Sequence, residues 1–285
     1  MAKCARCAGN AALIHVKDST SFYRCRHCDI IFTGERPLQE NLYSESYYKP
    51  WGLTDASEPR GRACKMATFQ RWLGSLERFG PTGKVLDVGC AAGFFLEAAK
   101  ERGWVPYGIE ISPFASDLAK KKFGGLVFTG TIENAPHAAE FFDSVTFFDV
   151  IEHVQSPEHF LRCVARMLKQ GGTIALSTVN ISSVSCRVLK RLWPHFKPEH
   201  VVYFSSKSLR KLLDNAGFET CAWSFACKDL TLAYIAAYFE SYPMPVLSFF
   251  FRSIVRLLPA SIASTPFRIF SGEMFVIARK RESAR

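Results

Sequence analysis

One short segment, Lys84-Val-Leu-Asp-Val-Gly-Cys-Ala-Ala-Gly93, constrains the fold of this chain more than any other. Its apolar residues Val85, Leu86 and Val88 predict a buried strand, and a helical pattern begins directly after Gly93. Small residues between a strand and a helix let a ligand approach the backbone, and the first turn of the helix offers free N–H groups. The segment therefore predicts a ligand-binding turn.

Nearby residues narrow the kind of ligand. The turn lacks the middle glycine of the dinucleotide fingerprint and the lysine of a phosphate-binding P-loop. Asp87, at the end of the strand, offers a carboxylate to a cation or an ammonium group. Glu110 ends the next apolar segment, where an acid can accept two ribose hydroxyls. An ordinary strand-to-helix turn of an α/β protein is the alternative interpretation.

The rest of the chain alternates between strand and helix patterns. Strands are predicted at 84–88, 105–110, 126–129, 144–149, 173–178, 218–225 and 274–279. Helices are predicted at 60–79, 93–102, 113–122, 157–169 and 206–216. This alternation predicts a doubly wound parallel α/β sheet.

The glycine turn, with Asp87 and Glu110, resembles motif I and the following acidic position of class I S-adenosylmethionine (SAM)-dependent methyltransferases. The resemblance implies a Rossmann-like, mostly parallel seven-stranded sheet whose last strand is antiparallel. It also implies that the segment 130–134 lies beside the adenine and that 148–154 lies beneath the methionine part. The cofactor-binding residues expected on this basis are Asp87, Gly89, Cys90, Gly93, Phe94, Glu110, Ile111, Thr131, Ile132, Asp149 and Val150.

The segment Phe148-Asp-Val-Ile-Glu-His-Val154 looks like the acidic Glu-His loop of the subgroup that includes ubiquinone-biosynthesis O-methyltransferases. Three interpretations are open. Asp149, Glu152 and His153 could hold Mg²⁺, which prefers carboxylate oxygens; His153 could be a general base; or the three could be structural. The subgroup often has Glu where this chain has Asp149, and the shorter acid weakens the metal interpretation.

Two cysteine pairs open the chain: Cys4 with Cys7, and Cys25 with Cys28, separated by seventeen residues. Each pair can direct two thiolates at one ion, so the spacing predicts a closed, structural four-sulfur zinc site. The segment between the pairs reads as a short hairpin with too small a core to fold without metal. A zinc module before a class I domain also resembles the layout of sugar C-methyltransferases.

We expect three parts: a zinc ribbon at 1–36, an aromatic linker at 37–59, and a methyltransferase domain at 60–285 with insertions near 179–205 and 228–272. The linker aromatics Tyr43, Tyr47, Tyr48 and Trp51 could dock the linker or cover a substrate pocket. The first insertion holds His200, a second candidate base, and basic side chains that could receive the phosphates of a sugar or lipid carrier.

The second insertion contains an apolar, arginine-bearing helical pattern at 245–258. Such a helix could pack inside the protein, dimerise, or lie at a membrane interface. No apolar run is long enough to span a membrane and the first residues lack a signal-peptide core, so we expect a cytoplasmic protein. A peripheral location at the inner face of the membrane is the alternative.

The predicted function is methyl transfer from SAM to a hydroxyl, less readily a carbon, of a small molecule such as a saccharide or another biosynthetic intermediate. The net charge of +10 suggests an anionic partner, and an RNA methyltransferase that docks RNA through its zinc ribbon is the alternative. The chain lacks the Asn/Asp-Pro-Pro-Tyr and Pro-Cys motifs of two RNA-modifying subclasses. A non-catalytic interaction protein is disfavoured by the intact Asp87, Gly89, Gly93 and Glu110.

Overall fold

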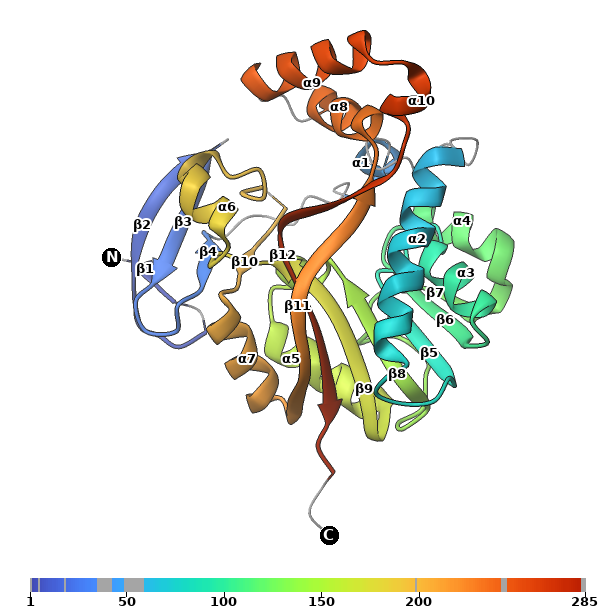
Figure 1. Cartoon of the computed structure of the whole chain (residues 1–285). Helices are drawn as coiled ribbons and strands as arrows, with labels where there is room; N and C mark the ends of the chain where they lie inside the picture. The colour runs from blue at the N-terminus through green and yellow to red at the C-terminus, as the bar shows by residue number, and fades with distance from the viewer. Residues whose placement is uncertain are drawn as a thin grey trace.

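The computed structural model describes residues 2–4, 6–17, 19–34, 43–48, 59–197, 199–241 and 245–282. Trp51 and most of the predicted linker lie outside these residues. Two sheets organise the described chain: a large central sheet, and a smaller one built around the N-terminal ribbon (Figure 1).

The large sheet has the strand order β11-β12-β9-β8-β5-β6-β7. The strands are β5 (Lys84–Val88), β6 (Val105–Glu110), β7 (Val127–Thr129), β8 (Phe142–Phe148), β9 (Leu168–Val179), β11 (Phe218–Leu230) and β12 (Phe267–Lys280). β5 to β9 pair in parallel, whereas β12 runs antiparallel to both β9 and β11. The sheet is therefore mixed, and its strand order places the end of β5 beside the ends of β6 and β8.

Helices cover both faces of this sheet. α2 (Pro59–Leu76), α3 (Phe94–Glu101) and α4 (Pro113–Phe123) share one buried cluster, and α5 (Pro157–Met167) and α7 (Ser206–Asn215) share the other. Consecutive strand residues point into different clusters, since Val85 belongs to the first and Leu86 to the second. A parallel strand buried on both faces needs this continuous apolar run, and the sequence of β5 supplies it.

Three strands are much longer than their sequence pattern predicts. β9 begins at Leu168 rather than at 173, so α5 ends at Met167 and not at 169. β11 continues to Leu230 rather than ending near 225, and β12 begins at Phe267 rather than 274. They form an antiparallel hairpin with irregular register near Phe225, which interrupts the alternation of apolar residues. The hairpin extends beyond the sheet and carries α8 (Leu232–Ser241), α9 (Pro245–Leu257) and α10 (Ala260–Ala263) at its tip (Figure 1). We call these three helices the helical arm.

The small sheet joins the ribbon to the first insertion. Its order is β1 (Ala2–Lys3), β2 (Asn10–Lys17), β3 (Thr20–Cys25), β4 (Ile31–Thr33) and β10 (Val202–Tyr203). The predicted hairpin is present as the antiparallel pair β2–β3. β10 pairs with β4, and insertion side chains Trp193, Phe196 and Tyr203 pack with Phe22 and Ile31. The insertion thus gives the ribbon an apolar core that residues 1–36 lack by themselves.

Two shorter helices complete the description. α1 (Glu45–Tyr48) comes from the predicted linker, and α6 (Val184–Leu189) lies within the first insertion. Among the described residues, no helix is both long enough and apolar enough to cross a membrane.

Candidate functional site

The predicted ligand-binding turn is a sharp bend between β5 and α3. Gly89 and Gly93 have φ angles of 79° and 80°, a region that favours glycine, and Ala91 also has a positive φ. A β-carbon at position 89 would lie 2.6 Å from Cγ2 of Val150, so that position accepts only glycine. The bend holds its backbone close to the end of β8, as expected where a ligand approaches main-chain atoms.

Asp87 is a buried acid beside this turn. Thr146 Oγ1 on β8 donates a 2.7 Å hydrogen bond to Asp87 Oδ1. Burial raises the pKa of Asp87 to about 8, against the effect of the Thr146 hydroxyl and with a further contribution from Glu110. A positively charged ligand group would therefore stabilise the ionised form of this carboxyl.

Glu110 is the second buried acid and is held by three donors. Ala91 N donates to Oε2 at 2.8 Å, while Ser112 N (2.9 Å) and the Tyr48 hydroxyl (3.2 Å) donate to Oε1. Burial raises the pKa of Glu110, although the two backbone N–H groups oppose it. Tyr48 comes from the predicted linker, so part of that segment docks against the site as one of the two sequence interpretations expected.

A cavity of about 230 Å³ opens beside the turn. Its walls come from the turn, α2, the end of β8, the end of β11 and the first turn of α8. Five of the predicted cofactor-binding residues line it: Asp87, Gly89, Cys90, Phe94 and Asp149.

The other predicted cofactor-binding residues lie around this cavity without lining it. Val150 touches the position of Gly89, and Gly93 precedes α3. In the loop after β7, Ile132 is buried in a core cluster and Thr131 is half-buried. Ile111 is 51% exposed beyond Glu110. The cavity therefore covers only the part of the predicted site that contains Asp87 and Asp149.

Asp149 has a cationic partner that the sequence did not indicate. Lys228 Nζ lies 2.7 Å from Asp149 Oδ2 and 2.7 Å from Glu273 Oε2, and Ser177 Oγ donates to the other oxygen of Asp149. Burial alone would raise the pKa of Asp149, but Lys228 outweighs it and lowers that pKa. Likewise, the two carboxylates raise the pKa of Lys228 against the effect of burial.

This ion pair argues against the magnesium interpretation. Both carboxylate oxygens of Asp149 already accept from Ser177 and Lys228, and Glu152 accepts from Thr178 Oγ1 at 2.8 Å. The donor set beside Glu152 is instead two histidine nitrogens, which suit Mg²⁺ poorly because that ion prefers oxygen ligands. We therefore derive no chemical step through Mg²⁺.

The three predicted catalytic residues, Glu152, His153 and His200, come together. Their potential ligand atoms all lie within 4.8 Å of one another, and the two imidazole centroids are 4.7 Å apart. Burial lowers the pKa of His153 to about 4, with Lys197 contributing, and holds the pKa of His200 well below its ordinary value. Burial also raises the pKa of Glu152 to about 8. At neutral pH both histidines are therefore neutral and able to accept a proton.

The orientation of these histidines follows from their neighbours. Nδ1 of His153 lies 3.1 Å from the carbonyl oxygen of Glu199, which fixes Nδ1 as the donor and leaves Nε2 as the basic nitrogen. In the described chain, buried Nδ1 of His200 has no hydrogen-bond partner. His200 reaches the site because β10 and the preceding turn are bound to the ribbon, and Val201 N donates to the Glu152 carbonyl oxygen.

Lys65 is another cavity residue that the sequence analysis missed. It stands on α2 and lies in the cavity wall, with its ammonium 5.3 Å from the ring centre of Phe94. Burial lowers the pKa of Lys65 to about 7, and nearby Lys228 lowers it further. The signal available in the sequence was a lysine on the apolar side of the helix predicted at 60–79.

The four N-terminal cysteines form a compact cluster. Their sulfur atoms all lie within 4.8 Å of one another, with Cys4 and Cys28 Sγ 3.7 Å apart and Cys7 and Cys25 Sγ 3.4 Å apart. Sulfurs bound at about 2.3 Å around a tetrahedral zinc ion would be about 3.8 Å apart. The donor set and spacing therefore fit a tetrahedral metal, and all four thiols are free of disulfides.

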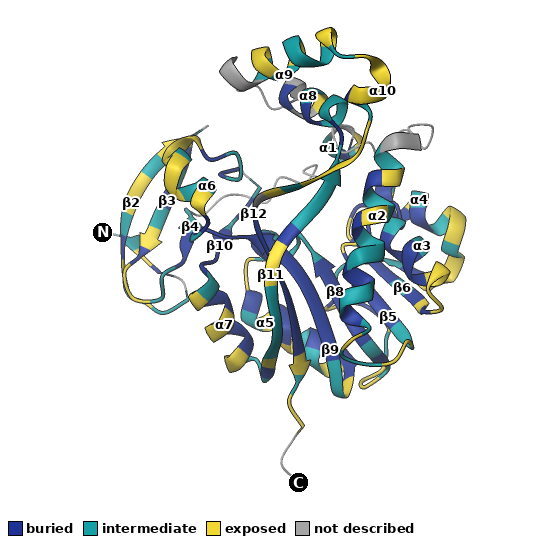
Figure 2. Ribbon diagram, viewed as in Figure 1, coloured by how far each residue is buried: buried dark blue, intermediate teal, exposed yellow. Residues whose placement is uncertain are grey.

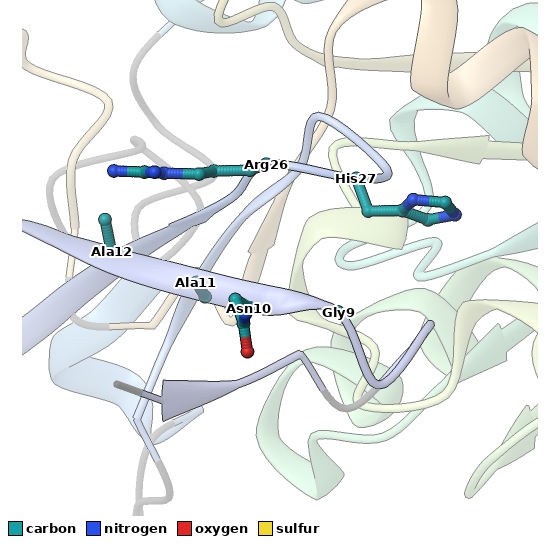
Figure 3. A pocket seen from close by; sticks show the side chains of 6 residues that line it. All are labelled: Gly9, Asn10, Ala11, Ala12, Arg26 and His27. Carbon is teal, nitrogen blue, oxygen red and sulfur yellow. The ribbon is translucent and has the colours of Figure 1, made fainter.

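A separate hollow of about 410 Å³ lies on the ribbon (Figure 3). It is lined by Gly9, Asn10, Ala11, Ala12, Arg26 and His27. The Arg26 and His27 side chains extend in opposite directions from one turn (Figure 3). The hollow shares no lining residue with the cavity at the glycine turn, and none of the predicted cofactor-binding or catalytic residues lines it.

Comparisons with known proteins agree with this geometry. The profile of the methyltransferase domain family matches residues 63–222, which is more than half of the chain. This chain belongs to the methyltransferase domain family. The match includes the glycine turn, both buried acids and the Glu152-His153 loop, and the sheet and helices described above are the Rossmann-like fold of SAM-dependent methyltransferases.

Two curated relatives carry the name ubiquinone biosynthesis O-methyltransferase. The protein from Azoarcus is 32% identical over 155 residues, covering 50% of this chain and 66% of its own length. The protein from Pseudomonas fluorescens is 39% identical over 111 residues, covering 36% of this chain and 48% of its own. The chain thus spans just under two thirds of the length of the first relative and about half the length of the second.

Solved structures extend the likeness in fold. A SAM-dependent methyltransferase from Archaeoglobus fulgidus superposes with a TM-score of 0.54 at 19% identity, covering 77% of this chain and 94% of its own. One from Thermotoga maritima gives 0.53 at 22% identity, covering 83% and 96%. At these identities the likeness concerns the fold alone.

Proposed function

We propose that this protein transfers the methyl group of SAM to a hydroxyl group of a small molecule. The observation that carries the proposal is the glycine turn, which lines a cavity together with Asp87. A second buried acid, Glu110, accepts a hydrogen bond from Ala91 N of the turn. The membership of the methyltransferase domain family supports it. SAM, when bound, supplies a methyl group already activated on a sulfonium, so the protein has only to align the acceptor and remove its proton.

The residues of the turn would divide the work of holding SAM. Asp87, whose pKa burial raises, would bind best a group that brings positive charge, such as the ammonium of the methionine part. Glu110, oriented by Ala91 N and Ser112 N, would accept the ribose hydroxyls. Gly89 would allow the ligand close to the backbone, and Phe94 would cover it at the start of α3.

His153 is the proposed general base. Its Nε2 is the basic nitrogen of a neutral imidazole, and it follows β8 only four residues after Asp149. Nε2 would take the hydroxyl proton while the acceptor oxygen bonds to the methyl carbon and the carbon–sulfur bond breaks. His200 and Glu152 would position the imidazole.

The acceptor is proposed as a saccharide or another hydroxylated biosynthetic intermediate. The curated relatives are named for oxygen methylation of a small molecule, which supports a hydroxyl acceptor rather than a carbon one. The RNA alternative rested on net charge and on the ribbon, and no relative reported above supports it.

Transfer of a labelled methyl group from SAM to a panel of phenols, catechols and hydroxylated sugars tests this function. His153→Ala should lower kcat at least about 100-fold, the usual contribution of a general base, with SAM affinity unchanged. His159→Ala is the matched control, because His159 is an exposed histidine on α5. Full turnover of His153→Ala would contradict the proposed base, and transfer to none of the panel would contradict the acceptor class.

We also propose that Cys4, Cys7, Cys25 and Cys28 hold one structural Zn²⁺. Four sulfurs complete a tetrahedral shell and leave no open position for a substrate, so the ion would stabilise the fold. Metal binding would add to the small core shared by β3, β4 and the insertion.

Elemental analysis of the purified protein tests the zinc proposal. We expect about one zinc per chain, its loss in Cys25→Ser, and its retention in Cys221→Ser, which changes a cysteine of β11 far from the cluster. A native protein that is folded and free of metal would contradict the assignment.

A further inference from the structure

Three side chains of different chemistry meet near the surface beside α5, outside the two sites described above. Glu133, His159 and Cys163 place a carboxylate oxygen, an imidazole nitrogen and a thiol sulfur within 4.8 Å of one another. None of the three lines the cavity at the glycine turn, and none belongs to the N-terminal cysteine cluster. Carboxylate, imidazole and thiolate are the side-chain groups that bind zinc in proteins.

Two elements bring these donors together. His159 and Cys163 stand four positions apart on α5, so they lie on one side of the helix, one turn from each other. Figure 2 shows α5 against the large sheet; its buried residues, such as Phe160, belong to a core cluster, while His159 is exposed. Glu133 comes from the irregular segment between β7 and β8, where its neighbour Ile132 is buried in the same cluster. Burial of these neighbours fixes where the three donors lie.

The spacing of the donors matches a metal site. Cys163 Sγ lies 3.7 Å from His159 Nε2. In a tetrahedral zinc site, a sulfur bound at about 2.3 Å and a nitrogen bound at about 2.05 Å would be about 3.6 Å apart. An S–H···N hydrogen bond has a similar length, but it would not account for the Glu133 carboxylate, which approaches both groups.

The acid and the thiol disfavour each other's ionised forms as long as no cation lies between them. Burial, and after it the Glu133 carboxylate, raises the pKa of the Cys163 thiol, whereas Arg166 and Arg162 lower it. A bound divalent cation reverses this effect, because a thiol that coordinates a metal loses its proton. The cluster therefore gains more from a cation than its separate side chains would.

We propose that Glu133, His159 and Cys163 bind one divalent transition-metal ion of the zinc type, separate from the ion of the ribbon. Imidazole and thiolate disfavour Mg²⁺ and Ca²⁺, which prefer oxygen ligands. Water would fill the fourth position of a tetrahedral ion, and the ion would join the segment 130–134 to α5. The site does not depend on methyl transfer, so its test requires neither SAM nor an acceptor. The methyl-transfer assay above is run without added metal.

Titration of Co²⁺ into the full chain, loaded beforehand with one Zn²⁺ in the ribbon, tests the site. Zn²⁺ binds such ligands more tightly than Co²⁺, so the ribbon should keep its zinc. Thiolate-bound Co²⁺ has a charge-transfer band in the near ultraviolet, which should saturate at about one Co²⁺ per chain. Cys163→Ser should abolish the band. His159→Ala and Glu133→Gln should each weaken binding at least about tenfold, since loss of a group that only hydrogen-bonds a ligand already costs about 10–100-fold.

Matched controls separate this site from the ribbon and from unfolding. Cys221→Ser and Glu219→Gln change a half-buried cysteine and an exposed acid of β11 and should leave the band and the affinity unchanged. Glu133 and His159 are exposed, so their variants should keep the wild-type thermal transition and test the site even if Cys163→Ser is unstable. A band that persists in folded Cys163→Ser would place the cobalt in the ribbon and overturn the proposal. So would a wild-type protein that shows no band.

Hydrogen exchange of the segment 130–134 gives a second readout. Bound Co²⁺ should slow the exchange of these amides in the wild-type protein, because a link to α5 lowers the population of locally open forms. The slowing should be absent in His159→Ala at a Co²⁺ concentration that saturates only the wild-type site. Exchange that bound Co²⁺ leaves unchanged in the wild type would contradict the link between this segment and α5.

Discussion

Two pairs of acids lie at the same edge of the main sheet, and their hydrogen-bond and ion-pair partners differ. Within the described part of the chain, Asp87 and Glu110 receive only neutral donors, from Thr146, Tyr48 and the backbone, and burial raises the pKa of both. Asp149 and Glu273 receive the ammonium of Lys228 between them. The first pair is suited to a ligand that brings positive charge, whereas the second already has its cation.

The partner of an acid at a strand end decides whether that acid can still bind a ligand. Desolvation penalises a buried carboxylate unless a partner compensates it. Where the chain supplies that partner, as Lys228 does, the acids join strands β8, β11 and β12. Where the chain supplies neutral donors alone, the acids keep their capacity for a ligand. The four experiments that follow change one pair or the other.

The largest effect should come from removing the cation of the second pair. Lys228→Met leaves Asp149 and Glu273 without their ammonium. Glu273 is buried whereas the Asp149 side chain is 40% exposed, so we expect a loss of about 3 kcal/mol of unfolding free energy, the cost of one buried charged group left without its partner. Urea denaturation measures the loss. Lys169→Met breaks the exposed ion pair with Asp143 and should cost less than about 1 kcal/mol. Equal losses of unfolding free energy in the two variants would show that the ion pairs of Lys228 do not stabilise the fold.

A smaller effect should follow from neutralising one acid of the first pair. Glu110→Gln keeps the shape of the side chain but loses its charge, so hydrogen bonds from the ribose hydroxyls become weaker. We expect SAM affinity to fall by about 2 kcal/mol, or roughly 30-fold. Fluorescence titration with SAM measures it, with Glu219→Gln on β11 as an exposed control. Unchanged affinity would remove Glu110 from the cofactor site.

The smallest effect concerns pH and the protein without SAM. Burial raises the pKa of Asp87 and Glu152 to about 8, above the ordinary values for Asp and Glu of 3.8 and 4.5. The folded state then holds more protons than the unfolded state, so the stability that these groups contribute is lost as pH rises towards 8. Above about pH 6.5 the neutral histidines no longer oppose this trend, whereas Lys65, whose pKa is lowered to about 7, offsets part of it.

Thermal unfolding from about pH 6.5 to 8 should therefore show a falling midpoint. Each carboxyl contributes at most about 1.4 kcal/mol per pH unit. Asp87→Asn should remove its share of the slope, and Asp214→Asn, at an exposed ion pair with Arg281, should leave the slope unchanged. A wild-type midpoint that rises over this range would contradict ligand-free, protonated acids.

The sequence predicted the first pair and missed the second for a physical reason. Each acid lies at the end of a short strand, Asp87 in β5 and Glu110 in β6, and the glycines follow β5. The local sequence therefore predicts these positions without any information on distant segments. Lys228 lies 79 positions from Asp149 and contacts it only because β11 continues past the predicted end of the strand. No local periodicity marks that extension, since the register of β11 and β12 is irregular there.

The ribbon shows the same limit. Cysteine spacing alone predicted the cluster, because two pairs of thiols on turns are a local signal. The pairing of β4 with β10 joins residues about 170 positions apart, such as Phe32 and Val202. That pairing brings His200 to Glu152 and His153. The structure brings these three candidates together, while the sheet that assembles them could not be derived from the sequence.

The most direct test of the central claim is calorimetric titration of SAM into the wild-type protein and Asp87→Ala, at pH 6 and at pH 7.5, where the α-amino group of free SAM, with an ordinary pKa of about 7.7–8.0, stays mostly protonated. We predict one binding site per wild-type chain, with affinity that rises with pH as Asp87 loses its proton. Asp87→Ala should bind at least about 30-fold more weakly, with no such rise, if an ammonium pairs with this acid. Equal affinity of the two proteins, or no binding by either, would contradict a cofactor site at the glycine turn.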